Sequence, residues 1–253
     1  SFLEAPFAYS MAQNESVSLN NGSLTHTVTD FVLPGRSGFN LSITRRYNSD
    51  SSNTGEMSAQ QPESYRFNTI SRPNWHNIKT YGLGFGWYFV LPSIEVVPVA
   101  ERQPYITYTP FLHLEDGRSF AFEGNTLRDH PLADVSLTNT AGTLRHPYRA
   151  EISRSYNIVV TYKNGNSDYF QQINDGEGRL DSYRLVARKD RFGNIMCFNI
   201  QNYGGMVITE TWGRDVVLKK DHDTLTWTLP DSTEKHPRTI TYTSDAKRWQ
   251  LLG

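Results

Sequence analysis

Hydrophobic and polar residues alternate along the segment F-N-L-S-I-T-R-R-Y-N, residues 39–48. Phe39, Leu41 and Ile43 share one parity, and the residues between them are polar. A period of two is that of a β-strand with one apolar and one solvated face. Pro34-Gly35 precedes the segment and favours a turn, because proline fixes φ and glycine tolerates a positive φ. The pattern predicts a turn followed by a half-buried strand.

Alternating runs also flank four further turn signals, which predicts antiparallel hairpins. Asn-Gly and Asp-Gly pairs are typical of tight hairpin turns, because these turns need residues that tolerate a positive φ. The four signals are Asn21-Gly22, Asp116-Gly117, Asn164-Gly165 and the polar residues 221–223. No segment has an apolar stripe of helical period and helical length. We therefore expect an all-β fold of antiparallel hairpins with little helix.

The chain is expected to contain two regions, residues 1–110 and residues 111–253. The first includes a small, polar stretch at residues 50–61 that we expect to be a flexible loop. The second includes a degenerate repeat, since Asp190–Asn194 and Trp212–Arg214, about twenty residues apart, both place glycine beside a polar residue. Because the chain begins without methionine and ends within an alternating pattern, we expect it to be a fragment of a longer protein.

The amino-acid composition of the chain is typical of a β-sheet protein, and it argues against some classes of function. Aromatic residues make up 13% of the 253 residues and hydrophobic residues only 37%, a mixture that fits sheets with one solvated face. The net charge of −1 argues against a nucleic-acid-binding protein, which usually has an excess of basic residues. No apolar run is long enough to span a membrane. The single cysteine, Cys197, excludes an intrachain disulfide, and we expect it to be a buried strand residue.

Motifs that would indicate a cofactor, a metal or a nucleophile are absent from the sequence. The chain has no G-x-S-x-G, and its seven histidines form neither H-x-x-x-H nor H-E-x-x-H. The acidic glycine loop at residues 174–181 lacks EF-hand spacing and is expected to be a solvated turn. No cofactor, metal site or catalytic residue is therefore predicted.

Three aromatic residues, Trp75, Tyr105 and Tyr108, are the candidate ligand-binding residues, because exposed rings of this kind stack on sugars. Packing in the core or anchoring of a loop explains the same residues and is the interpretation that we favour. The sugar-binding interpretation stays as the alternative.

Three segments of the chain form an ordered set of motifs. They are residues 29–49 (T-D-F-V-L-P-G-R-S-G-F-N-L-S-I-T-R-R-Y-N-S), residues 82–87 (G-L-G-F-G-W), and residues 190–199 (D-R-F-G-N-I-M-C-F-N) with W-G-R at 212–214. In this order they resemble the shell entry, the following G-x-G-W and the repeat pattern of RHS/YD-repeat proteins, the β-sheet shells of polymorphic toxins. Phe198 stands where the repeat commonly has tyrosine, and no Tyr-Asp dipeptide occurs. The residues that carry the resemblance are Asp30, Pro34, Gly35, Arg45, Tyr47, Asn48, Gly84, Gly86, Trp87, Asp190, Gly193, Asn194, Gly213 and Arg214.

The resemblance implies a curved, extended sheet that is part of an RHS-type shell. Residues 1–110 would then be an entry or plug-like region, and residues 111–253 the start of the repeats. It implies a structural, non-enzymatic role in enclosing or scaffolding a downstream toxin, in a bacterial protein that is secreted or displayed on the cell surface. The implied partners are further repeats and the toxin of the same polypeptide, with a secretion-system or surface component as another. A carbohydrate- or surface-binding β module is the alternative, and a glycan-processing enzyme is the third hypothesis.

Overall fold

The fold is described by a computed structural model for residues 15–17, 24–49, 83, 87–100, 106–128, 134–174, 180–200, 205–221, 224–233, 235–245 and 250–252. Most of these residues lie in antiparallel strands, and a 3-10 turn, η2, lies at Arg36–Gly38. The prediction of an all-β fold is confirmed. The predicted loop at residues 50–61 lies outside the described residues.

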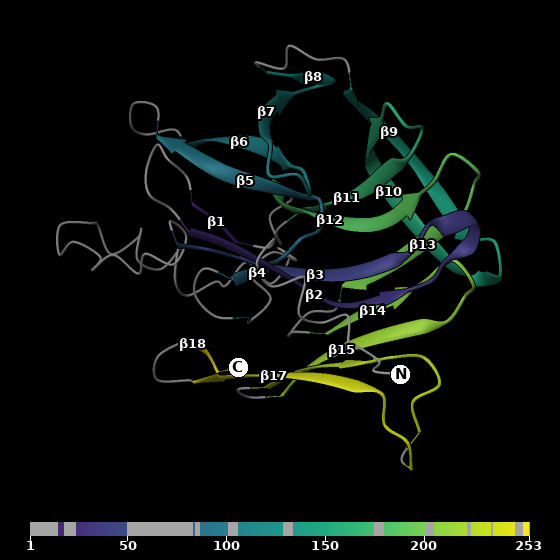
Figure 1. Ribbon diagram of the computed structural model, residues 1–253. Coiled ribbons are helices and arrows are strands. Elements are labelled where there is room, and N and C mark those ends of the chain that lie inside the picture. The colour runs from purple at the N-terminus through teal and green to yellow at the C-terminus, as the bar shows by residue number, and fades with distance from the viewer. Residues whose placement is uncertain are drawn as a thin grey trace.

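The strands form three sheets (Figure 1). The N-terminal sheet has the order β1-β2-β3-β4, with β1 at Glu15–Val17, β2 at Leu24–Leu33, β3 at Leu41–Asn48 and β4 at Trp87–Phe89. The middle sheet has the order β5-β6-β7-β8, with β5 at Ser93–Ala100, β6 at Ile106–His113, β7 at Ser119–Glu123 and β8 at Thr126–Leu127.

The third sheet has ten strands in sequence order, so each strand between the two end strands pairs with its predecessor and its successor in the chain. Its strands are β9 (Val135–His146), β10 (Arg149–Tyr162), β11 (Ser167–Asn174), β12 (Leu180–Lys189), β13 (Ile195–Ile200), β14 (Met206–Thr209), β15 (Asp215–Asp221), β16 (Thr224–Thr228), β17 (Thr239–Asp245) and β18 (Gln250–Leu252). Figure 1 shows this ten-stranded sheet curving from β9 and β10 down to β17. The expected curved, extended sheet is therefore present.

The strands on both sides of all four predicted turn signals pair as expected. The pairs are β1 with β2, β6 with β7, β10 with β11, and β15 with β16. In two of these hairpins the turn is described, and its glycine has a positive φ, 94° at Gly117 and 86° at Gly165. The turn residues 18–23 and 222–223 of the other two hairpins lie outside the described residues.

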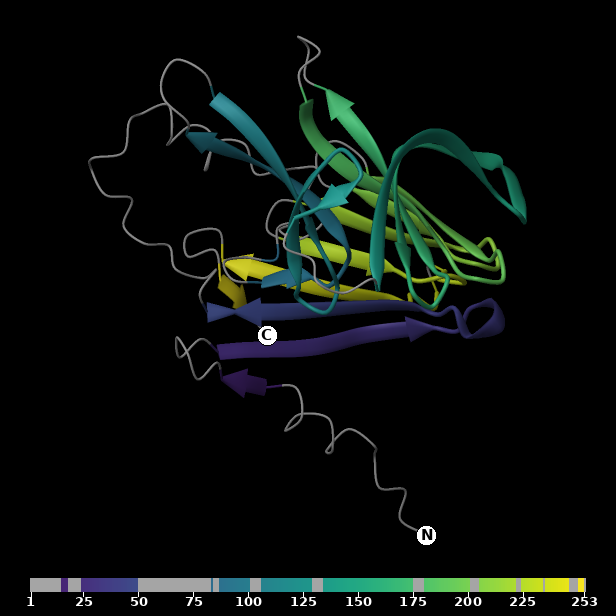
Figure 2. The same cartoon turned by 90° about the horizontal axis from the view of Figure 1, so that it is seen from above.

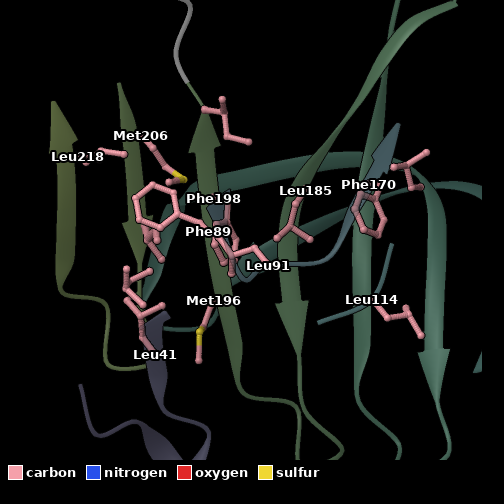
Figure 3. Packing of buried hydrophobic residues seen from close by; sticks show 14 of the residues in the cluster. Leu41, Phe89, Leu91, Leu114, Phe170, Leu185, Met196, Phe198, Met206 and Leu218 are labelled. Atoms are coloured by element: carbon pink, nitrogen blue, oxygen red, sulfur yellow. The ribbon is translucent and has the colours of Figure 1, made fainter. Parts of the chain in front are cut away.

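One hydrophobic core joins the three sheets. It includes Ile43 of β3, Leu112 of β6 and Trp227 of β16, each at most 1% exposed. Figure 3 shows Phe89 of the N-terminal sheet beside Phe198 and Met206 of the ten-stranded sheet. The boundary predicted between residues 110 and 111 falls inside β6, and buried side chains on both sides of it belong to this core.

A second, smaller core lies on the opposite face of the ten-stranded sheet. It contains Tyr169, Val186, Ala187, Ile195 and Cys197, and it is covered by Leu144, Ile152, Tyr156 and Val159 of the long hairpin β9–β10. Strands β11 to β13 are consequently buried on both faces. This explains why the run at residues 195–198 is fully buried and does not alternate.

The Cys197 thiol should therefore be unreactive in the folded protein. It is fully buried, and burial raises its pKa to about 11, so almost none of it is thiolate at neutral pH. We expect labelling by a disulfide reagent to be more than about a hundredfold slower in the native state than in denaturant. Rapid labelling of the native protein, at the rate of a cysteine peptide measured in parallel, would contradict the buried position.

Candidate functional surface

Two turns of the ten-stranded sheet have the same structure. The first connects β12 to β13 through Asp190–Asn194, and the second connects β14 to β15 through Glu210–Arg214. In both, the N–H of the first residue donates to the carbonyl of the fifth, and the N–H of the glycine donates to the carbonyl of the first. Gly193 and Gly213 have φ values of 87° and 85°, which L-residues with side chains adopt only at a cost. The positive φ therefore explains why glycine occupies the fourth position of both turns.

A buried carboxylate begins each of these turns and binds its backbone. Asp190 is 4% exposed; its Oδ1 accepts from the N–H groups of Phe192 and Asn194 at 2.9 and 2.8 Å. Glu210 is 1% exposed; its Oε2 accepts from the N–H of Trp212 at 3.1 Å and its Oε1 from the N–H of Arg214 at 2.9 Å. The shared pattern is an acid, two variable residues, glycine and a polar residue.

The fifth residue of each turn also binds the acid through its side chain. Asn194 Nδ2 donates to Asp190 Oδ2 at 2.7 Å, and Arg214 Nε donates to Glu210 Oε1 at 3.0 Å. Asp190, Asn194 and Arg214 are among the residues predicted from the sequence, and Glu210 is not. The signal for Glu210 was present, since an acid precedes each of the two glycines by three positions.

The turn between β2 and β3 docks onto these two repeat turns. The backbone N–H of Arg36 donates to Thr211 Oγ1 at 2.8 Å, and Arg214 Nη2 donates to the Pro34 carbonyl at 3.4 Å. Gly35 is in extended conformation, but a Cβ there would lie against the Phe39 carbonyl and 2.8 Å from Thr211 Oγ1. The predicted Pro34-Gly35 turn is therefore also a close contact between sheets, and only glycine fits it.

Arg36 lies between the aromatic rings of two other turns. Its guanidinium carbon is 4.5 Å from the centroid of Tyr148 and 4.6 Å from that of Trp212, within the range of cation–π attraction. Tyr148 is fixed by its N–H, which donates to Nδ1 of the buried His146 at 3.2 Å. The other ring nitrogen of His146 donates to the Glu210 carbonyl at 2.8 Å.

We call the four turns at residues 34–38, 147–148, 190–194 and 210–214 the turn edge. Figure 2 shows the purple turn between β2 and β3 on the same side of the molecule as the green and yellow turns of the ten-stranded sheet. Seven of the predicted motif residues lie in these turns: Pro34, Gly35, Asp190, Gly193, Asn194, Gly213 and Arg214.

A second cluster joins the N-terminal sheet to β17. Arg45 Nε donates to both carboxylate oxygens of Asp30, at 3.0 and 2.8 Å, and Tyr242 Oη donates to Asp30 Oδ2 at 2.6 Å. The Arg45 guanidinium lies 4.6 Å from the ring centroid of Tyr242 and 5.1 Å from that of Trp87. Burial and the hydrogen bond to Asp30 raise the pKa of Tyr242, so its hydroxyl stays a donor.

This second cluster accounts for four of the predicted motif residues. Asp30, Arg45 and Trp87 are members, and Tyr47 packs on Trp87 with ring centroids 5.5 Å apart. Asn48 lies at the end of β3, opposite Thr25. Tyr242 was not predicted, because nothing in the local pattern of β17 shows that it faces β2.

A third cluster, centred on Arg188 of β12, joins the middle sheet to the ten-stranded sheet. Arg188 Nε donates to Asp168 Oδ1 at 2.8 Å, and its Nη1 and Nη2 donate to the two oxygens of Glu115 at 2.7 and 2.9 Å. Tyr162 Oη donates to Asp168 Oδ2 at 2.6 Å. Burial raises the pKa of Asp168, and the charge of Arg188 opposes that rise.

Several predicted residues lie beyond what the structure describes. Trp75, Gly84, Gly86 and Tyr105 are outside the described residues, as is most of the acidic glycine loop. Tyr108 lies in β6, where its backbone pairs with Pro98. Within the described ranges, no three His, Cys, Asp or Glu side chains are grouped closely enough to bind a metal ion. No helix in that part of the chain is long and apolar enough to cross a membrane.

Part of the chain matches the model of a known protein family. Residues 14–60 match the family model described as "Domain of unknown function (DUF6531)". This range holds strands β1 to β3, the Pro34-Gly35 turn and the Asp30–Arg45 pair. No curated protein matches the chain.

Proposed function

We propose that this chain is a structural wall segment of an RHS-type toxin shell, which encloses or scaffolds a downstream toxin. The observation that carries the proposal is the ten-stranded sheet, whose strands are added in strict sequence order. A sheet built in this way grows by one strand-turn-strand unit at a time, and its width is set by the number of units. Such growth suits a wall made from a repeated sequence.

The repeat turns support this role because the carboxylate of each is bound within the turn itself. The carboxylates of Asp190 and Glu210 accept from the backbone and from the fifth residue of their own turns. A turn whose acid is bound by its own residues can recur along a chain. The shared structure of the two turns therefore explains why their sequence pattern recurs.

The buried acidic groups also support a structural role. The carboxylates of Asp30 and Asp168 each bind an arginine and a tyrosine, and those of Asp190 and Glu210 bind turn N–H groups. An acid that acts in catalysis must be able to exchange a proton with a substrate at an accessible position. These four instead hold strands and sheets together.

The margin of the ten-stranded sheet at β18 supports continuation of the wall. Among the described residues, β18 pairs with β17 on one side and with no strand on the other. An open margin presents backbone N–H and C=O groups that another strand can pair with. Further repeats of the same polypeptide would supply that strand.

Limited proteolysis of the full-length protein tests the enclosure directly. We expect the downstream toxin to resist a protease in the intact protein and to be digested when Glu210 is replaced by alanine, because the turn then loses its buried acceptor. The matched control is Glu151→Ala, which removes a 65% exposed acid on β10. Digestion of the toxin at the same rate in the intact protein and as a separate domain would refute the proposal.

A second prediction concerns this segment expressed alone. Its unpaired margin should cause self-association that increases with concentration, measurable by analytical ultracentrifugation. Leu251→Lys in β18 should reduce this association, because a charged residue on an edge strand disfavours edge-to-edge pairing. Asn199→Lys, on an exposed position of the central strand β13, serves as the control and should leave association unchanged. A monomer at every concentration would count against an open wall.

A further inference from the structure

The turn edge carries three exposed aromatic side chains. Tyr148 is 51% exposed, Trp212 52% and Phe192 63%, and each lies in a turn at this edge. Exposed rings in separate places need no explanation, but several on one edge indicate a surface that binds something. These rings do not close into the core, since neither core cluster includes them.

Two arginines accompany these rings without an acidic partner. Arg36 lies between Tyr148 and Trp212, and the guanidinium carbon of Arg191 is 4.6 Å from the ring centroid of Phe192. In the part of the chain that the structure describes, neither guanidinium group forms an ion pair or a side-chain hydrogen bond. Each therefore keeps its donors available for a ligand.

Other arginines at or beside the turn edge do have acidic partners. Arg149 forms ion pairs with Glu151 and Asp215, and Arg214 pairs with Glu210. The contrast shows that the edge has acids for its structural arginines and none for Arg36 and Arg191.

The position of Arg36 is fixed before any partner arrives. Its backbone N–H is bound to Thr211, and its two flanking rings belong to turns held by His146 and Glu210. A guanidinium held in one place loses little conformational entropy when it binds, which favours affinity. The planar fork of donors matches the two oxygens of a carboxylate.

We propose that the turn edge is a docking surface for an acidic segment of another polypeptide, with Arg36 as its anchor. Tryptophan, tyrosine and arginine are the residue types that dominate the energetics of protein interfaces, and all three meet here. A carboxylate of the partner binds Arg36, and apolar groups beside it pack on Trp212 and Phe192. The proposal goes beyond the wall role and does not depend on it.

The charge of the chain favours a polypeptide partner over a nucleic acid. A nucleic acid gains affinity from many phosphate contacts along a basic track. Here the net charge is −1, and the edge offers two unpaired guanidinium groups among the described residues. A peptide that carries two carboxylates has enough charge to pair with both of them.

Calorimetric titration with a synthetic peptide of alternating Glu and Leu tests the surface. We expect the peptide to bind, and the same peptide with Gln for Glu to bind at least about tenfold more weakly. Arg36→Gln should weaken binding about tenfold and Phe192→Ser severalfold. Arg128→Gln is the control, because Arg128 is a 57% exposed arginine paired with Glu123 beyond the turn edge, and it should leave binding unchanged.

Several outcomes would overturn the inference. These are no binding of the acidic peptide at millimolar concentration, equal binding of the Gln peptide, no effect of either variant, or tighter binding of oligodeoxythymidine than of the peptide. If Arg36→Gln unfolds the protein, Phe192→Ser still gives a decisive test, because Phe192 is 63% exposed and, among the described residues, its ring contacts the Arg191 guanidinium. Circular dichroism of each variant identifies unfolding.

Discussion

Replacing Gly35 by alanine should destabilise the protein by about 3 kcal/mol or more, measured as the free energy of unfolding in denaturant. The backbone of Gly35 is extended, with a φ of −109°, so the loss does not come from backbone conformation. It comes from space, because the added Cβ would lie against the Phe39 carbonyl and near Thr211 Oγ1. To admit it, the turn between β2 and β3 must change its own conformation around Phe39 and also move away from the repeat turn at residues 210–214.

Gly38→Ala in the same turn is the matched control for this prediction. Gly38 has a φ of 76°, but a Cβ there would meet nothing within 4 Å. We expect it to cost only about 1 kcal/mol, the usual strain of an alanine in the left-handed region. If Gly35→Ala lowered the free energy of unfolding no more than Gly38→Ala does, the described close contact between the N-terminal and ten-stranded sheets would be refuted.

Replacing Arg188 by alanine should destabilise the protein by about 3–5 kcal/mol, because it leaves the buried carboxylate of Asp168 without its cation. The side chain of Asp168 is 2% exposed, so water cannot replace the lost guanidinium. The variant also separates Glu115 of the middle sheet from β12. Chemical denaturation at neutral pH measures the loss.

Arg118→Ala provides the comparison for Arg188→Ala. Arg118 pairs with Asp116 and Asp134 at 2.8 Å, but its side chain is 37% exposed, and exposed pairs of this kind contribute at most about 1 kcal/mol. Equal losses in the two variants would show that the Arg188 cluster is not buried as described.

The loss in Arg188→Ala should also depend on pH. Burial raises the pKa of Asp168, and removal of Arg188 takes away the charge that opposes this rise. A carboxyl group whose folded-state pKa lies above its unfolded value binds a proton more tightly in the folded state. Stability then falls as the pH rises above the unfolded pKa of about 4. The deficit relative to wild type should therefore shrink as the pH is lowered toward about 4, and a deficit that grows in acid would contradict this account.

The sequence predicts the hairpins well because their signals are local. Alternation and a glycine turn lie within a few residues of each other, and β6–β7 and β10–β11 form where both occur. Alternation fails where the structure buries both faces of a strand. Residues 167–170 are all buried, although Asp168 is charged, because the hairpin β9–β10 covers the second face of this part of the sheet.

The candidate surface could be predicted only in part. Asp190, Gly193 and Asn194 follow from the repeat pattern, and their structural reason is a turn that the sequence contains in full. Arg36 does not follow from it, because its partners Tyr148 and Trp212 come from turns far along the chain. Tyr242 could not be predicted for the same reason, since its contact with Asp30 joins residues that are 212 positions apart in the chain.

The sequence order of the ten strands has a kinetic consequence. Neighbouring strands can pair soon after they are synthesised, so the sheet has mainly short-range contacts and can form progressively from its N-terminal end. The contact between Asp30 and Tyr242 is the opposite case, because it must wait until β17 has emerged. Folding should therefore show a fast phase of hairpin growth and a slower final phase, in which the first strands of the chain close onto its last ones.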